Sequence, residues 1–430
     1  MAKVVLATAG SDGDVHPFIA IGLSLKARGI DTVIATRAGF RGKIEREGLG
    51  FHELRPDLAD LEAAGLAPEA VARGVTDPVT GLRFLLKRLI LPFARASFDD
   101  LLAACDGADL MVAHRLVLTA PLVAEYRDLP WMSAVLQPLG FFSAYDPPVT
   151  GWAPALDAIR PLLGPAVYRP LLRYMAEKSA PWFEPLRALR SELGLPPDPR
   201  SPLLEGPYGS RGTLGLYSKL FGEIQPDHPP GTRIVGFAAY DSQDGGSATL
   251  PPELAAFLDA GEPPVVFTLG ASAAMNPGDF YQVSAQAAQR AGVRAVLVMG
   301  PVGQAARPET LCENIIACAY VPYSALFPRA LVIAHPGGIG AGAQALMAGR
   351  PQLVTPFMAD QPDNAAHLTR LGVARTLSPK RFTAASASRA IEALASRLAY
   401  ADAARRAAVV MATENGAETA ADVIARAITG

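Results

Sequence analysis

The sequence predicts an α/β protein with two doubly wound domains, and two kinds of observation lead to this fold class. Short apolar runs typical of buried strands, such as those at 3–9, 31–36 and 265–269, alternate with segments of helical composition. Strand–helix–strand order implies parallel sheets. A chain of 430 residues is also long enough for about two or three domains, each with its own core.

The expected elements divide the chain into two α/β halves. In the first half, Pro17 suits the first turn of a helix that ends near Arg28. Further strands of the first half are expected near 51–54, 110–113, 131–136, 214–217 and 233–235, and further strands of the second within 294–300, 314–321 and 331–338. The expected domains are an N-terminal domain over 1–220, a linker region over 221–248, a C-terminal domain over 249–400, and a C-terminal helix over 401–430 that packs back on the N-terminal domain.

Composition excludes several classes of protein. Hydrophobic residues make up 50% of the chain and charged residues 19%, which is typical of a globular protein. A net charge of −2 predicts no nucleic-acid partner. The three cysteines have no metal-binding spacing, and no signal peptide precedes the first expected strand. We therefore expect a soluble cytoplasmic protein and leave its oligomeric state open.

Two segments allow more than one interpretation. Leu82–Phe98 is basic and apolar at once, which fits a helix in transient contact with a membrane surface or over an apolar substrate. It also fits an ordinary helix with its polar face in water, and we favour that interpretation. From Gly140 to Pro197 the chain is rich in proline and aromatic residues. This segment fits either a pocket wall for a flat apolar ligand or a helical insert with an ordinary core.

The stretch 331–364 carries the most specific signal. A short apolar run ends at His335, and an Ala-rich helical segment begins a few residues later. The glycines between and just inside these elements are Gly337, Gly338, Gly340 and Gly342. Glycines where a strand enters a helix let backbone N–H groups approach an anion, and the helix N-terminus adds partial positive charge. A polar cluster at 360–364 follows the next apolar run and is expected at the same sheet edge, so a phosphate-bearing ligand is predicted.

Two functional interpretations compete for this stretch. Gly338, Gly340 and Ala343 fit the G-x-G-x-x-A pattern of an NAD(P)-dependent oxidoreductase, with Asp360 about 20 residues further on. However, Asp360 lies beyond its strand, and a histidine before the glycines is foreign to that pattern. The alternative is a nucleotide-sugar transferase in which the histidine and the helix start bind the diphosphate. A crossover whose glycines serve packing alone is the least favoured interpretation.

Three motifs resemble one known family. HPGGIGA followed by GRPQLVTPFMADQPDNA resembles the donor-binding signature of family 1 glycosyltransferases, which have the GT-B fold. The sequence is most similar to the bacterial antibiotic, sterol and rhamnosyl transferases, and it also resembles plant UDP-glycosyltransferases. GSDGDVHPF near the N-terminus and VVFTLGAS in the centre fit as well, so the resemblance covers most of the chain. It implies two Rossmann-like domains facing each other across a cleft, with the acceptor bound by the N-terminal domain and the nucleotide sugar by the C-terminal domain.

The resemblance also implies a set of donor-binding residues. Those for the diphosphate are His335, Gly337, Gly338, Ile339, Gly340, Gly270 and Ser272. Those for the nucleoside are Tyr320, Val321, Pro322, Tyr323 and Gln344, and those for the sugar are Asp360 and Gln361. His335 is expected to donate a hydrogen bond to a diphosphate oxygen. Members that use UDP-sugars often have a glutamate where this chain has Ala343, which favours a dTDP-sugar such as dTDP-rhamnose over UDP-glucose.

The loop after the first strand is the second candidate site. In the resembling family it faces the acceptor, and Asp14 occupies the position of the general base, which typically accelerates a reaction about 10²–10⁴-fold. Asp14 is also placed to cap the following helix. His16 is a candidate second base or a polar pocket residue. His114 stands where plant members place an acidic residue that orients the base. A metal site at Asp12 and Asp14 is a weaker interpretation.

The function expected from these features is transfer of a hexose to a hydroxyl of an apolar small molecule, with inversion and without a metal or other cofactor. The nucleotide sugar, of the dTDP-rhamnose or UDP-glucose type, is the co-substrate. A natural product, a flavonoid, a sterol or a lipid-like molecule fits as the acceptor. Two other hypotheses are the NAD(P)-dependent oxidoreductase and a noncatalytic binding protein that keeps the GT-B fold.

Overall fold

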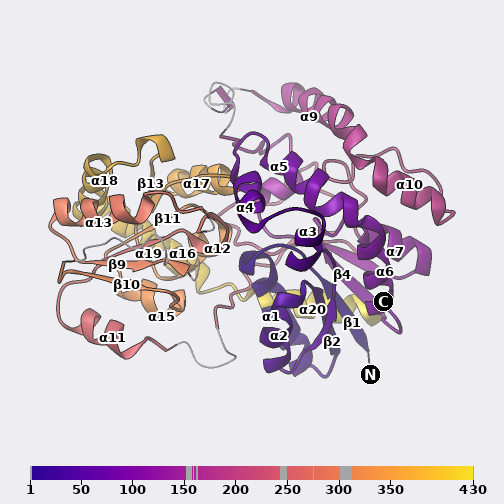
Figure 1. The fold of residues 1–430 in the computed structure, drawn as a ribbon, viewed down its shortest axis with the longest axis horizontal. Helices are drawn as coiled ribbons and strands as arrows, with labels where there is room; N and C mark the ends of the chain where they lie inside the picture. Colours follow the sequence, from indigo (N-terminus) through magenta and orange to yellow (C-terminus); the bar gives the residue numbers. More distant parts are fainter. Residues whose placement is uncertain are drawn as a thin grey trace. The chain divides into compact units, whose positions relative to one another are not determined.

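The structure is a computed structural model that describes residues 2–151, 157, 159–160, 163–242, 249–274, 276–300 and 312–429. The chain divides into two compact units (Figure 1). Unit 1 comprises Met1–Val75, Val79–Tyr240 and Asn415–Gly430, and unit 2 comprises Thr76–Pro78 and Asp241–Glu414. Each unit is built on its own sheet.

Unit 1 contains a parallel sheet of seven strands in the order β3-β2-β1-β4-β5-β6-β7. The strands are β1 (Lys3–Ala7), β2 (Asp31–Thr36), β3 (Gly50–Glu53), β4 (Leu110–His114), β5 (Trp131–Val135), β6 (Thr213–Gly215) and β7 (Thr232–Ile234). β1 lies between β2 and β4, with Ala7 beside Ala35 on one side and Ala113 on the other. The strand order reverses at β1, and ligands of such sheets bind outside the carboxyl ends of strands at this point.

Helices cover both faces of this sheet. One face packs on α1 (Asp12–Ala27) and α20 (Gly416–Thr429), and the other on α6 (Ala94–Ala104), α7 (Ala120–Arg127) and α10 (Glu184–Glu192). The remaining described helical segments of unit 1 are η1 (Ala38–Phe40), α2 (Arg41–Arg46), α3 (Leu58–Ala63), α4 (Pro68–Thr76), α5 (Gly81–Phe84), η2 (Leu85–Ile90), η3 (Leu91–Phe93), η4 (Pro138–Phe141), α9 (Pro165–Ser179) and η6 (Ala180–Phe183).

Unit 2 contains a parallel sheet of six strands in the order β10-β9-β8-β11-β12-β13. The strands are β8 (Val265–Thr268), β9 (Ala295–Val298), β10 (Ile315–Cys318), β11 (Val332–His335), β12 (Gln352–Val354) and β13 (Ala374–Thr376). Its described helical segments are α11 (Pro252–Asp259), α12 (Gly270–Ala273), α13 (Phe280–Ala291), α15 (Tyr323–Leu326), η8 (Phe327–Arg329), α16 (Ile339–Met347), α17 (Gln361–Arg370), η9 (Pro379–Arg381), α18 (Ala384–Ser396) and α19 (Leu398–Met411). The predicted α/β architecture of two doubly wound parallel sheets is confirmed.

The end of the chain forms two helices rather than one. α19 belongs to unit 2, where it packs on α16, and α20 belongs to unit 1, where it packs along α1. Arg28, just after α1, holds α20 through Glu418 at 2.7 Å and Asp422 at 2.6 Å. The break between the two helices lies at 412–415.

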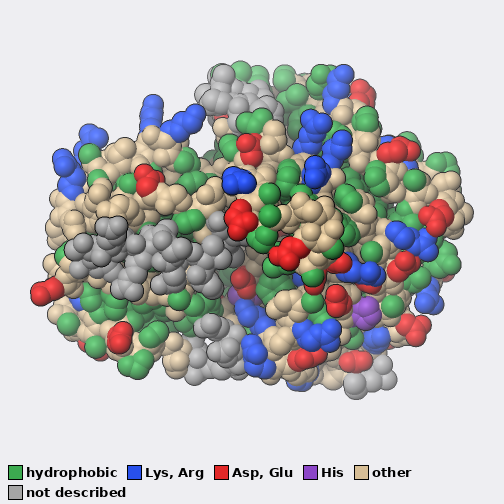
Figure 2. Space-filling view, in the orientation of Figure 1, with side chains coloured by type: hydrophobic (Ala, Val, Ile, Leu, Met, Phe, Trp, Pro, Cys, Tyr) green, Lys and Arg blue, Asp and Glu red, His purple; other side chains and the backbone are tan. Residues whose placement is uncertain are grey.

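The basic and apolar segment Leu82–Phe98 folds as a run of short helical pieces that includes a π-helical turn at η2. Its apolar residues Leu86, Leu91 and Phe98 are buried within unit 1, whereas Lys87 and Arg88 are exposed. None of the helices among the described residues has the length and apolar composition needed to cross a membrane. On the face that Figure 2 shows, Lys and Arg side chains are interspersed with Asp and Glu.

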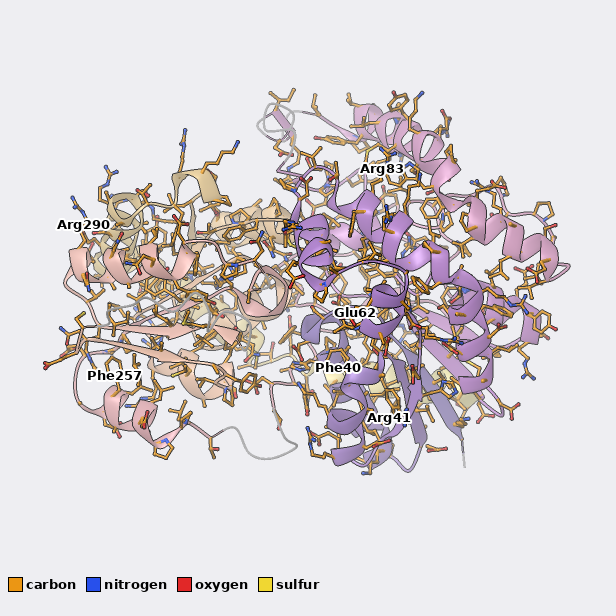
Figure 3. The ribbon with its side chains drawn as sticks, viewed as in Figure 1. Phe40, Arg41, Glu62, Arg83, Phe257 and Arg290 are labelled. Carbon is orange, nitrogen blue, oxygen red and sulfur yellow. The ribbon has the colours of Figure 1, made fainter. Side chains whose placement is uncertain are left out.

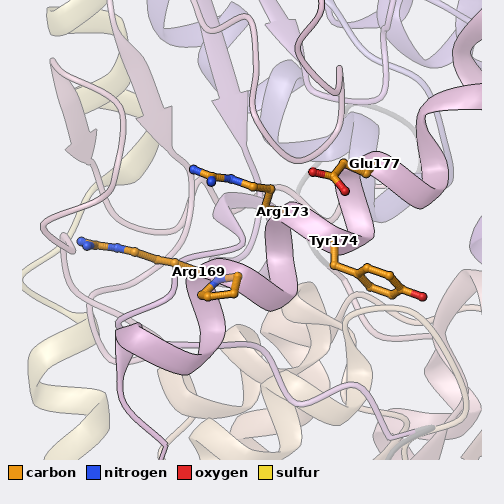
Figure 4. A pocket seen from close by; sticks show the side chains of 5 residues that line it. Arg169, Arg173, Tyr174 and Glu177 are labelled. Atoms are coloured by element: carbon orange, nitrogen blue, oxygen red, sulfur yellow. The ribbon is translucent and has the colours of Figure 1, made fainter.

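The aromatic segment from Gly140 to Pro197 forms η4, α9, η6 and α10 where it is described. The letters WAPAL at 152–156, which belong to this segment, lie outside the described residues. α9 carries a shallow hollow lined by Arg169, Pro170, Arg173, Tyr174 and Glu177 (Figure 4). All of these residues come from one helix, so the hollow is a feature of the surface of α9.

Candidate functional site

The loop between β11 and α16 depends on one glycine. Gly337 has a φ of +97°, and a Cβ placed there would lie 2.9 Å from Val354 Cγ1 and 3.0 Å from Gln361 O. No L side chain is accommodated in that space or favoured at that φ. Gly337 therefore brings the backbone of this loop close to β12 and to the start of α17.

The next glycines leave space at the start of α16. A Cβ on Gly338, the N-cap residue, or on Gly340 would meet no atom of the surrounding described residues within 4 Å. The helical ladder begins with Gly342 N–H, which donates to Gly338 O at 3.0 Å. The N–H groups of the first helical turn thus have no acceptor within the helix, and they lie at the helix end that carries partial positive charge. Open space beside such amides is what an anion needs.

His335 is held entirely by the protein. Gly337 N–H donates to its Nδ1 at 3.0 Å, so Nε2 carries the proton, and Gln352 Oε1 accepts it at 2.8 Å. Burial lowers the pKa of His335 to about 4, against a smaller opposing effect of the Gln352 hydrogen bond. The imidazole is therefore neutral with both nitrogens engaged. In this arrangement it positions Gly337, and it has no free N–H for the diphosphate oxygen that the sequence predicted as its partner.

The polar cluster after β12 is tied to the same loop through Asn364. Its Nδ2 donates to Gly337 O at 2.9 Å and to Asp360 Oδ2 at 2.6 Å. Gln361 is buried, and its Oε1 accepts from the N–H groups of Phe357 at 2.8 Å and Met358 at 3.1 Å. Of the two predicted sugar-binding residues, Gln361 thus uses its side-chain oxygen for hydrogen bonds within its own loop. Asp360 is linked to the glycine loop through its hydrogen bond with Asn364.

The structural links of this cluster differ from the prediction. Gln352 and Asn364 hold the loop together, and no individual role was predicted for either residue from the sequence. The signal for Asn364 was its place four residues after Asp360, on the same helix face. Ala359, just before the cluster, has a φ of 52°, which is uncommon for a residue other than glycine. Such strained backbone often lies at ligand sites.

The predicted nucleoside residues surround the ends of β10 and β8. Tyr323 stacks on Phe327 with ring centroids 4.3 Å apart, and its hydroxyl contacts Thr268 Oγ1 at 2.7 Å. Thr268 Oγ1 also accepts from Gly270 N–H at 3.1 Å. The structure therefore brings Tyr323 and Gly270 together through Thr268, a residue for which no role was predicted from the sequence.

The other residues predicted for the nucleotide are spread around this point. Tyr320 is half-buried and donates from its hydroxyl to Asp241 O at 2.5 Å. Val321 and Pro322 are buried, and Gln344 is half-buried on α16, the helix that begins at Ile339. The backbone of Ser272 lies in α12, but its side chain lies outside the described residues.

In unit 1, Asp14 is fixed at the start of α1. Its Oδ2 accepts from Ser11 N–H at 2.7 Å and from Ser11 Oγ at 3.1 Å, which completes a capping box. Gly10 allows this approach, since a Cβ there would lie 2.2 Å from Asp14 Oδ2. The other carboxylate oxygen, Oδ1, receives no hydrogen bond from any described residue. Asp14 thus caps the helix with one oxygen and keeps the other available.

His114 lies at the end of β4, next to β1. It is buried, and burial lowers its pKa, while the negative charge of Asp14 and a hydrogen bond to the backbone of Ala9 oppose that effect. Its Nδ1 is buried without a partner among the described residues. The structure therefore places His114, as a neutral imidazole, close enough to Asp14 for the carboxylate charge to affect its pKa.

His16 belongs to a separate cluster. Its Nε2 lies 3.2 Å from Asp12 Oδ1 and 2.9 Å from Lys43 Nζ, and its ring meets Tyr240 edge-on at 5.1 Å. The hydrogen bond with His16 is the main cause that lowers the pKa of Asp12. Asp12 and Asp14 thus have different partners. Within the described part of the chain, no group of three or more His, Cys, Asp or Glu residues is placed to hold a metal ion.

Comparison with known proteins assigns both halves of the chain. Residues 4–130 match the glycosyltransferase family 28 N-terminal domain, and residues 288–428 match the C-terminal domain of erythromycin biosynthesis protein CIII-like proteins. The chain is 31% identical to O-mycaminosyltylonolide 6-deoxyallosyltransferase of Streptomyces fradiae, over 98% of this chain and 96% of that protein.

Solved structures share the fold. Spinosyn forosaminyltransferase superposes with a TM-score of 0.71 at 18% identity and covers 100% of both chains. Spinosyn rhamnosyltransferase complexed with thymidine diphosphate has a TM-score of 0.66 at 18% identity and covers 99% of both chains. These similarities identify the chain as a glycosyltransferase, so Gly338, Gly340 and Ala343 are no longer interpreted as the motif of an oxidoreductase. The resemblance inferred from the three motifs is confirmed, and the chain belongs to the family 1 glycosyltransferases of the GT-B fold.

Proposed function

We propose that this glycosyltransferase moves a hexose from a nucleotide-diphosphate sugar to a hydroxyl of an apolar small molecule, with inversion at the anomeric carbon. The donor is of the dTDP-rhamnose or UDP-glucose type. The Streptomyces fradiae relative is named as a 6-deoxyallosyltransferase for O-mycaminosyltylonolide, and one solved neighbour is a complex with thymidine diphosphate. These names support a natural-product acceptor and a dTDP-sugar for this chain.

The observation that carries the proposal is the open space beside Gly338 and Gly340 at the N-terminus of α16. Backbone N–H groups of this turn would bind the diphosphate, which suits an anion without requiring a charged side chain. His335 and Asn364 would keep the loop in shape from behind. Asp360 would bind sugar hydroxyls, and the rings of Tyr320 and Tyr323 would serve the nucleoside.

The chemistry would be a single displacement. The acceptor oxygen attacks the anomeric carbon while the bond from that carbon to the diphosphate oxygen breaks. Oδ1 of Asp14 takes the hydroxyl proton, because Oδ2 is occupied by Ser11. The leaving diphosphate carries the developing negative charge to the α16 N-terminus, an electrostatic contribution that is often the largest in such reactions. No step requires a metal ion or another cofactor.

A thermal-shift comparison tests the donor half of this proposal. dTDP or UDP should raise the melting temperature, since a ligand at about 100 times its Kd adds about 2.7 kcal/mol of stability, whereas NAD should not. Gly338→Leu should abolish the effect of dTDP by filling the open space. Gly164→Leu is the matched control, because Gly164 is the N-cap of α9 and a Cβ there also meets no atom within 4 Å in the part of the chain that the structure describes. Equal dTDP binding by both variants would refute the proposed diphosphate site.

Transfer itself is tested with a promiscuous phenolic acceptor and a panel of dTDP- and UDP-sugars, with EDTA present. Product should form with a β-linked sugar from an α-linked donor, and EDTA should leave the rate unchanged. Loss of turnover in EDTA that added Mn²⁺ restores would contradict metal independence. Binding of dTDP without transfer to any acceptor would favour the noncatalytic protein instead.

A further inference from the structure

Arg37 lies directly after β2, at the sheet edge that carries Asp14. β2 pairs in parallel with β1, so the residues that follow the two strands leave the sheet at the same edge. The backbone of Arg37 is extended, with φ −58° and ψ 146°, before the short turn η1. Its half-buried side chain lies over the ring of Phe40, with the guanidinium carbon 5.3 Å from the ring centroid. Phe40 is labelled in Figure 3.

The guanidinium of Arg37 receives no hydrogen-bond partner from the part of the chain that the structure describes. Nε is closed off from solvent, whereas the two Nη atoms are not closed off in this way. Burial lowers the pKa of Arg37, and the nearby charges of Asp14, Asp12 and Asp57 oppose that effect without forming a salt bridge. Because arginine stays protonated in proteins, this is a partly desolvated cation whose donors are unused.

Other cations of this region are paired. Arg55 holds Asp100 with Nε at 2.8 Å and Nη2 at 2.7 Å, and Lys43 holds Asp12 at 3.2 Å. Arg41, labelled beside Phe40 in Figure 3, lies 3.8 Å from the carboxylates of both Glu45 and Glu53. Arg37 differs from these three, although it is close to three carboxylates.

Two more polar atoms at this edge are unsatisfied. Thr36 Oγ1 at the end of β2 and His114 Nδ1 at the end of β4 are buried, and neither has a partner among the described residues. Both residues are level with Thr8, which follows β1. Because buried polar groups are nearly always hydrogen-bonded in a functional state, this edge is suited to a ligand or ordered water that brings polar atoms to it.

We propose that Arg37 binds a neutral oxygen of the acceptor, a carbonyl or an ether, beside the hydroxyl that reacts; this inference rests on the proposed function. The Nη atoms supply charge-assisted hydrogen bonds. The oxygen is neutral because Asp12, Asp14 and Asp57 would repel an acceptor carboxylate. Arg37 thereby selects oxygen-rich acceptors, such as hydroxylated ketones and lactones, over a sterol, whose hydroxyl stands alone on a hydrocarbon frame.

The test compares 3-hydroxyacetophenone with 3-ethylphenol, which differ in the carbonyl oxygen. For each phenol, Kd without donor and kcat/KM with the donor are measured in the wild type, Arg37→Met and Arg41→Met. The wild type should prefer the ketone in both measurements. Arg37→Met should reduce that preference by roughly 10- to 100-fold, the usual effect of losing a hydrogen bond to a charged group. Arg41→Met should keep it, and intrinsic differences between the phenols cancel in the comparison.

Three results would overturn the inference: an unchanged preference in Arg37→Met, an equal loss for both phenols, or a preference of the wild type for the ethyl compound. An equal loss would mean that Arg37 acts on Asp14 and not on the acceptor. If Arg37→Met does not fold, Arg37→Lys keeps the charge and should lose part of the ketone preference, with the same three outcomes counting against it. Absence of transfer with every donor would refute the proposed function, and the Kd comparison would still decide the role of Arg37.

Discussion

Replacing His335 with asparagine should remove a pH dependence from the stability of unit 2. Burial lowers the pKa of His335 from its ordinary value of 6.5 to about 4. Below about pH 6.5 the unfolded chain therefore binds a proton at this histidine that the folded chain does not bind. As the pH is lowered from 6.5 to about 4, the free energy of unfolding decreases, and below about pH 4 it levels off. The amide oxygen of the introduced asparagine would still accept from Gly337 N–H, but this side chain does not titrate.

The expected magnitude follows from the two pKa values. The full interval is worth about 3 kcal/mol, because one pKa unit corresponds to about 1.4 kcal/mol. Between about pH 7.5 and about pH 5, the wild type should lose about 2 kcal/mol more than His335→Asn. At neutral pH the variant should already be less stable by about 1 kcal/mol, since it gives up the hydrogen bond to Gln352. The effect of protonating His335 is therefore measured by the change in unfolding free energy between the two pH values, and not by the absolute stability at either pH.

Urea unfolding followed by circular dichroism is the suitable assay. The two described tryptophans, Trp131 and Trp182, belong to unit 1, so fluorescence is a poor probe of the loop in unit 2. Comparison of the two proteins also cancels the contributions of His114 and His228, whose pKa values are likewise lowered by burial. If the wild type and His335→Asn lose the same stability on acidification, the buried neutral imidazole inferred from the structure is refuted.

Four further substitutions separate structure from function. Gly337→Ala should lower the melting temperature, because its Cβ would lie 2.9 Å from Val354 Cγ1 at a φ of +97°. Gly340→Leu should keep the melting temperature of the wild type but lose dTDP binding, as measured by calorimetry. The reverse pattern would contradict the structural role of Gly337 and the binding role of Gly340. Asn364→Leu leaves Gly337 O without its donor, so it should cost about 1–3 kcal/mol of stability by chemical denaturation and weaken dTDP binding, and unchanged affinity would separate the polar cluster from the site. Asp14→Asn should lower kcat by about 10²–10⁴-fold at unchanged dTDP affinity, and full turnover in a discontinuous product assay would exclude Asp14 as the base.

The fold was predictable because its signals are local. Apolar runs of strand length and the glycines after His335 each specify structure within a few residues, and their order along the chain gives the two parallel sheets. The placement of Pro17 in the first turn of its helix was wrong, because α1 begins at Asp12 and Pro17 lies inside it. The break at 412–415 was missed, since the Ala-rich composition on both sides favours helix and only tertiary packing assigns α19 and α20 to different units.

The candidate site was predictable only as far as motifs reach. The glycine loop and Asp14 stand out in sequence, and their roles toward substrate stay predictions. Gln352 lies 17 residues from His335 and meets it only through the pairing of β11 with β12, so no spacing rule reveals the contact. Arg37 follows a strand and looks like any surface arginine in sequence. That Arg37 forms no salt bridge with the carboxylates around it is evident only from the structure.

The most direct test of the central claim is a crystal structure of the protein with dTDP. The phosphate oxygens should lie about 2.7–3.2 Å from backbone nitrogens of the first turn of α16, in the space beside Gly338 and Gly340, with His335 still bonded to Gln352. A complex in which the diphosphate lies away from this turn, or is held mainly by side chains elsewhere, would contradict the account.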